Sequence, residues 1–142
     1  MKRHVAVFTL PLLMLALTGC IRSAQPAPVE PDTADTAACL TLSAGASEAL
    51  QHGLDEVWPN QSILNTAAIA TPDGDTWFVA ATVDSQGDEV EAVWYTVNDP
   101  TEAGDNAYLS VDAVAETISY YARPDGASIT MDGAQQALDC LT

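Results

Sequence analysis

The sequence predicts an α+β domain: about three helices packed on a three- to four-stranded antiparallel meander sheet, closed by one disulfide between its ends. Three observations predict this fold. Three apolar runs follow one another with only short turns between them, apolar residues recur at helical spacing before and after the runs, and Cys39 and Cys140 bracket the whole region. Strands joined this tightly pair antiparallel, because parallel neighbours need a long crossover connection.

Apolar residues three and four positions apart predict a first helix over residues 43–57. These positions are Ala46, Leu50, Leu54 and Val57. Pro59 ends the pattern, because proline cannot continue a helix. Gly53 lies inside the pattern and weakens the helix by about 1 kcal/mol relative to alanine.

The three apolar runs predict the strands of the sheet. They cover residues 63–70, 76–83 and 90–97, and the turns between them fall at 71–75 and 84–88. The second and third runs are rich in aromatic and β-branched side chains, which favour strands. Both turns combine Asp with Gly, a composition typical of tight turns.

A second helix is predicted after the sheet, with Ser110 as its N-cap and with Asp112 and Glu116 facing outward. Its apolar face comprises Leu109, Val111, Val114, Ala115, Ile118 and either Tyr121 or Ala122. Residues 123–126 contain Pro and Gly, and we expect the helix to end there.

Asp132, with Gln135 three positions later, has the spacing of a capping box and predicts the start of a last helix. The residues expected on its buried side are Ala134, Ala137, Leu138 and Leu141. Residues 129–131 are expected to form a short strand or an extended entry. We expect the helices to lie on one face of the sheet.

The first nineteen residues have the organisation of a secretory signal peptide. Lys2 and Arg3 precede an apolar run at 5–17, which is too short to span a hydrocarbon core of about 30 Å. A transmembrane anchor is the alternative that this length disfavours. The run ends in Leu17-Thr18-Gly19-Cys20, which resembles the lipobox of bacterial lipoproteins.

This resemblance implies cleavage before Cys20 and a diacylglyceryl thioether on its sulfur, with palmitate-like acyl chains. Two acyl chains hold a protein at a membrane where one chain gives only marginal binding. The resemblance therefore implies a lipoprotein on the extracytoplasmic face of the cell membrane. Residues 20–38, which contain three prolines, are expected as a flexible tether, although part of them could instead pack as an edge segment. Residues 39–142 are expected to form a single α+β domain.

The lipid on Cys20 leaves Cys39 and Cys140 as a natural pair in an oxidising compartment. Their disulfide would close a loop of about 100 residues and contribute roughly 4–5 kcal/mol on the chain-entropy model. Two free buried thiols are the alternative. Zinc is disfavoured because two cysteines without a nearby histidine supply only half of a zinc site.

The domain also resembles small secreted or lipid-anchored proteins of unknown function from actinobacteria and their phages. The resemblance rests on Cys39 before the first helix, on Val93-Trp94 with Thr96, and on the closing segment from Ile129 to Cys140. It implies the same fold and the same disulfide. It transfers no functional residue.

The charge excludes nucleic acid as a partner. The chain carries 4 basic and 20 acidic residues, a net charge of −16, and a phosphate backbone needs basic residues to neutralise it. Removal of Lys2 and Arg3 with the leader would leave −18, because no acidic residue is lost with them. So acidic a surface would repel anionic lipids, and the lipid on Cys20 would have to provide the anchoring.

No catalytic centre is predicted. His52 is the only histidine after processing, it lies on the first predicted helix, and no motif marks a nucleophile for it. No phosphate-binding loop or zinc spacing is present in the sequence, and we expect no cofactor.

Adjacent aromatic residues in the second and third strands provide a candidate interaction patch. Neighbours in a strand face opposite sides, so Trp77, Trp94 or Tyr95 would lie on an uncovered sheet face if helices cover only one side. The alternative is a sheet covered on both sides, since the strands show little polar alternation.

Carboxylates in the two hairpin loops provide weak candidate ligands for Ca²⁺. These are Asp73, Asp75, Asp84 and Asp88, although Asp is also ordinary in turns. Together the observations favour a lipid-anchored binding domain that lacks catalytic activity and has an envelope protein as a possible partner. A calcium-binding or hydrolytic surface protein is the alternative. A phage superinfection-exclusion lipoprotein is a further alternative, by analogy alone.

Overall fold

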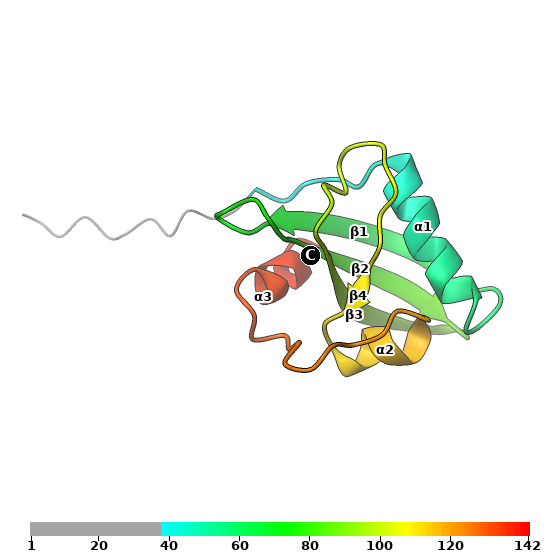
Figure 1. Cartoon of the computed structure of the whole chain (residues 1–142). Helices are drawn as coiled ribbons and strands as arrows, with labels where there is room; N and C mark the ends of the chain where they lie inside the picture. Colours follow the sequence, from blue (N-terminus) through cyan, green and yellow to red (C-terminus); the bar gives the residue numbers. More distant parts are fainter. Residues whose placement is uncertain (1–37) are drawn as a thin grey trace, which may run out of the picture. The chain divides into compact units, whose positions relative to one another are not determined.

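The computed structural model describes residues 38–142. The expected signal peptide, Cys20 and all of the expected tether except residue 38 lie outside the described residues. The helices and strands in chain order are α1 (Ala44–Asp55), β1 (Ser62–Ala70), β2 (Trp77–Ser85), β3 (Asp88–Thr96), β4 (Leu109–Ser110), α2 (Ala113–Ile118) and α3 (Ala134–Asp139) (Figure 1). In this region no helix has the length and apolar character needed to cross a membrane.

The four strands form one antiparallel sheet in the order β1-β2-β3-β4, which confirms the predicted α+β meander. β2 and β3 pair without interruption from Trp77 opposite Thr96 to Ser85 opposite Asp88. β1 pairs with β2 through a bulge between Ile63 and Asn65, which leaves Leu64 without an opposite residue. A bulge of this kind locally bends an edge strand.

The fourth strand lies where the sequence predicts the start of a helix. Leu109 pairs with Tyr95 and Ser110 with Trp94, and the backbone N–H of Val111 donates to the carbonyl of Val93 at 2.9 Å. Pairing with β3 has therefore overridden the helical spacing of this segment. Residues 129–131, expected as a short strand or an extended entry, form a turn followed by a bend.

Helices cover both faces of the sheet, so the expectation that they share one face is wrong. α1 and α2 pack on the face that carries Val79, Ala81 and Trp94. α3 packs on the opposite face and lies apart from α1 and α2 in Figure 1. The alternating residues of β2 and β3 supply buried side chains to both faces, and the strands accordingly lack polar alternation.

The helix ends differ in detail from the sequence expectations. Helix α1 is shorter than predicted by one residue at its start and two at its end, and the Ser43 hydroxyl caps it by accepting from the N–H of Ala46 at 3.2 Å. Helix α2 is capped by Asp112 and not by Ser110, because Ser110 is part of β4. It ends at Ile118, before the predicted stop.

Helix α3 has no side-chain cap, so the predicted capping box of Asp132 and Gln135 is wrong. The chain enters α3 through Gly133, whose φ of 95° is a conformation that favours glycine. The predicted inner face is correct: Ala134 and Ala137 are buried, and the two leucines that follow pack against the same core cluster.

Candidate functional site

The three aromatic side chains of the candidate patch do not form an exposed surface. Trp94 is completely buried under α2, where its indole N–H donates to the Ser119 hydroxyl at 3.0 Å. Trp77 and Tyr95 are half-buried. They point to opposite faces of the sheet, since Tyr95 packs against the α3 core and Trp77 shares its face with Val79. The prediction that these aromatic side chains form one exposed patch is wrong.

The two acidic loops lie at opposite ends of the sheet. Asp73 and Asp75 precede β2, whereas Asp84 and Asp88 lie at its far end. A strand of nine residues spans about 30 Å at roughly 3.3 Å per residue. One cation cannot reach both loops, so the four candidate carboxylates do not gather around a single Ca²⁺. Across residues 38–142 no group of three or more His, Cys, Asp or Glu is arranged to hold a metal ion.

Asp73 has a structural role in its turn. The Thr71 hydroxyl and the backbone N–H of Asp75 donate to its carboxylate, and these hydrogen bonds lower the pKa of Asp73 below its usual value. A turn stabilised in this way accounts for the aspartate without a ligand.

His52 lies on the surface of α1, as the sequence suggests. Its Nε2 is 3.6 Å from a carboxylate oxygen of Glu56, one turn along the helix, and its ring meets the exposed ring of Tyr120 edge-on at 6.3 Å. These contacts are those of a surface histidine.

The described part of the chain has an open groove of about 500 Å³ between the flank of α1 and the outer edge of β1. It is lined by Thr41, Ser47, Glu48, Gln51, Ile63, Leu64, Asn65 and Thr66. We call this feature the β1 groove. Its volume is within the range of small-ligand sites.

Gln51 fixes one end of the β1 groove. Its amide oxygen accepts the backbone N–H of Ile63 at 3.2 Å, and its amide nitrogen donates to the carbonyl of Gln61 at 2.8 Å. The side-chain amide thus takes the place that a peptide group of a neighbouring strand would occupy. It ties α1 to the start of β1 and blocks further pairing there.

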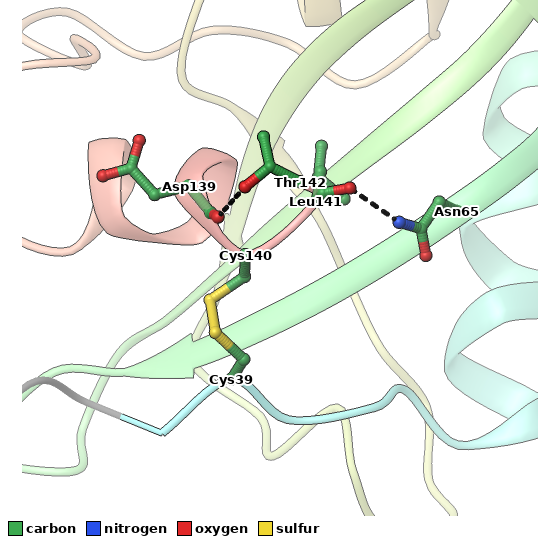
Figure 2. Close-up of a disulfide and its surroundings, with 6 residues drawn as sticks. All are labelled: Cys39, Asn65, Asp139, Cys140, Leu141 and Thr142. Carbon is green, nitrogen blue, oxygen red and sulfur yellow. Dashed lines mark hydrogen bonds between the residues drawn. A yellow bond between two sulfur atoms is a disulfide. The ribbon is translucent and has the colours of Figure 1, made fainter.

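The other end of the edge is closed by the chain that precedes α1. Leu40 pairs antiparallel with Ala68 through two hydrogen bonds, of 2.9 and 2.8 Å. Next to it, the Cys39–Cys140 disulfide joins this segment to the end of α3, with the two Cα atoms 5.7 Å apart (Figure 2). The predicted disulfide is confirmed. Asn65 adds a further tie by donating to the carbonyl of Leu141 at 3.1 Å.

Between these two closed ends the edge of β1 stays open at Thr66. Ala68 directs both of its backbone groups outward to Leu40, and Thr66 two residues earlier faces the same edge. Its N–H is satisfied by the side-chain oxygen of Asn65 at 2.9 Å. The open stretch borders the β1 groove, and β1 carries no charged side chain along its whole length.

No sequence motif indicates this site. Gln51, Asn65 and Thr66 are ordinary polar residues of a helix flank and a strand, with no motif to mark them. The one available signal is Leu64, an apolar residue that the structure leaves 51% exposed within a strand. Ile63 and Leu64 are adjacent apolar residues in β1, and they break the alternation of apolar and polar side chains where the bulge lies.

No protein-family model, curated protein or solved structure matches this chain.

Proposed function

We propose that this chain is a lipid-anchored, extracytoplasmic binding domain that acts without catalysis. The observation that carries the proposal is the disulfide between Cys39 and Cys140. Such bonds persist in oxidising compartments and are rare in the cytosol. Once these two cysteines are joined, Cys20 is the single remaining thiol, and it stands directly after an apolar leader.

The β1 groove supports the binding half of the proposal. It is open, and it lies on a frame held by the disulfide, by the Leu40–Ala68 bridge and by Gln51. A rigid frame reduces the ordering that a binding site must undergo when it takes its ligand. The surface histidine and the separated acidic loops favour binding over hydrolysis, because neither brings catalytic groups together.

Lipidation is tested by expressing the full chain in a bacterium that processes lipoproteins and by feeding a fatty acid with a detectable tag. We expect the mature protein to begin at Cys20, to carry the tag and to sediment with membranes. Cys20→Ala should abolish the label. The double variant Cys39→Ala/Cys140→Ala is the matched control and should still be labelled, because its cysteines serve the fold.

Mass spectrometry provides the opposing outcome. A full-length cytosolic polypeptide with an unmodified Cys20 and reduced Cys39 and Cys140 would contradict the proposal.

A further inference from the structure

The negative charge of the domain favours positively charged partners. Three of the 20 acidic residues precede residue 38, namely Glu30, Asp32 and Asp35, so 17 remain in the described part of the chain. Arg123 is the single Lys or Arg in that part, and its guanidinium lies 3.2 Å from the carboxylate of Glu116. The field of such a surface repels anions and attracts cations.

The lining of the β1 groove combines one charged side chain with several hydroxyl groups. Glu48 is the only charged residue among those that line the groove. Among residues 38–142, no hydrogen bond or ion pair engages the Glu48 carboxylate or the hydroxyls of Thr41, Ser47 and Thr66. The amides of Gln51 and Asn65, by contrast, are already occupied.

The apolar part of the β1 groove completes the match to one kind of side chain. Ile63 and Leu64 provide an aliphatic surface in the same groove as Glu48. A lysine has a four-carbon stem that packs on apolar surface and an ammonium group with three donors and no acceptor. Glu48 and the nearby hydroxyls supply only what such a group needs: negative charge and acceptors.

A lysine bound in the β1 groove would have to come from another protein. The only lysine of the chain is Lys2, in the expected signal peptide, so a second copy of the mature protein has no lysine to offer. Thr66 presents an outward-facing carbonyl beside the groove, and an extended segment can donate a backbone N–H to an open strand edge.

We propose that the β1 groove binds a lysine side chain on an extended segment of a partner protein, with the ammonium at Glu48 and the segment along the β1 edge at Thr66. This inference deepens the proposed binding function and rests on it. It does not depend on the lipid. If Cys20 proves unmodified but the groove binds lysine, only the anchor fails; if Cys20 is lipidated and the groove does not bind, only this inference fails.

The test uses the full chain, oxidised and held in an uncharged detergent, with the probe acetyl-Thr-Val-Lys-Val-Thr-amide. The β-branched residues keep the probe extended. A second peptide with norleucine in place of lysine keeps the aliphatic stem and removes the charge. We expect norleucine to weaken binding by about tenfold or more, the effect of losing one charge-assisted hydrogen bond. Amide NMR signals of residues 64–66 should move with the lysine peptide.

Glu48→Gln should weaken binding of the lysine peptide by about tenfold for the same reason. Glu89→Gln is the matched control: it removes the same charge from an exposed position on β3, outside the groove, and should change the affinity less than twofold. Leu64 is half-exposed, so Leu64→Ala should leave the fold intact. It should weaken binding severalfold by removing the aliphatic surface.

Three results would overturn the inference. Equal losses in Glu48→Gln and Glu89→Gln would indicate general charge attraction with no groove. Equal affinity for the norleucine peptide would show that the ammonium group contributes nothing to binding. NMR shifts confined to another surface, or no binding of the lysine peptide at millimolar concentration, would show that the β1 groove is not the binding site.

Discussion

Gly53 of helix α1 gives room for the ring of Tyr121, which packs directly against the helix backbone. A Cβ atom at position 53 would lie 2.6 Å from Cζ of that ring and closer still to Cε2. The close approach allows the Tyr121 hydroxyl to donate to the carbonyl of Ala49 at 2.7 Å, while the N–H of Tyr120 donates to the carbonyl of Gly53 itself. The glycine that weakens α1 as an isolated helix is therefore required by the packing of the domain.

Gly53→Ala should destabilise the fold although alanine is the better helix former. We expect the free energy of unfolding to fall by about 1–3 kcal/mol, the usual cost of overpacking, despite a gain in helix propensity of about 1 kcal/mol. Gly45→Ala is the matched control in the same helix, since nothing lies within 4 Å of its added Cβ. It should leave stability unchanged or raise it. Urea denaturation of both variants measures the difference, and equal effects would contradict the packing role.

The Cys39–Cys140 bond should contribute much of the stability of so small a domain. The two cysteines are 101 residues apart, and the chain-entropy model gives about 4–5 kcal/mol for a loop of this length. Reduction, or the double replacement by serine, should lower the midpoint of urea unfolding accordingly. Figure 2 shows that the bond joins the chain before α1 to the end of α3. An unchanged midpoint after reduction would contradict this contribution.

The sheet and the disulfide could be predicted from the sequence because their signals are local. The three long strands are continuous apolar runs separated by turns that combine Asp with Gly, and β1, β2 and β3 begin and end within two residues of their predicted bounds. The disulfide was predicted by elimination, because the expected lipid on Cys20 leaves only Cys39 and Cys140 to pair. The inner face of α3 was also correct, since alanines at helical spacing indicate burial wherever the helix packs.

The other features depend on which surfaces of the elements pack together, and a single sequence does not show this. Residues 109–112 have helical spacing, but pairing with β3 turned them into a strand and a cap. The prediction of Trp94 as exposed failed because α3 covers the second face and α2 the first. The β1 groove could not be found at all, because it is made by the flank of one element and the edge of another.

Variants of Asp112 and Asp132 compare a helix cap seen in the structure with a helix cap predicted from the sequence alone. The two carboxylate oxygens of Asp112 accept from the N–H of Ala115 at 2.7 Å and from the N–H of Val93 at 3.1 Å. Asp112→Ala removes a helix cap and leaves a strand N–H without its partner, and we expect a loss of about 2–3 kcal/mol. Asp132→Ala should change stability by less than about 0.5 kcal/mol, since its side chain caps nothing.

Asp112→Asn sharpens that comparison, because its side chain keeps one acceptor oxygen and should give an intermediate loss. Thermal or urea unfolding of the three variants provides the measurement. If Asp132→Ala were as destabilising as Asp112→Ala, the cap predicted from the sequence would be real and the observed entry into α3 wrong.

Two tyrosines should make the fold sensitive to alkali. Burial raises the pKa of Tyr108 and of Tyr121, and their hydroxyls donate to the carbonyls of Ala46 and Ala49 in α1. Because the pKa of both is higher in the folded protein, their contribution is complete below the unfolded value of about 10 and is lost as the pH rises above it. We expect the free energy of unfolding to decline with pH above about 10.

Tyr108→Phe tests whether Tyr108 stays protonated in the folded protein. The test uses the slope of the unfolding free energy against pH as well as the stability at neutral pH. One tyrosine that stays protonated in the fold and ionises on unfolding contributes about 1.4 kcal/mol per pH unit to the decline. The variant should lose stability at neutral pH with its hydrogen bond to α1, yet show a decline with pH that is shallower by about that amount. Urea midpoints at neutral pH and at a series of pH values above about 10, followed with tyrosinate absorbance, measure both quantities. An unchanged slope would mean that Tyr108 ionises as readily in the folded protein as in the unfolded chain, and that its contact with α1 does not hold it protonated.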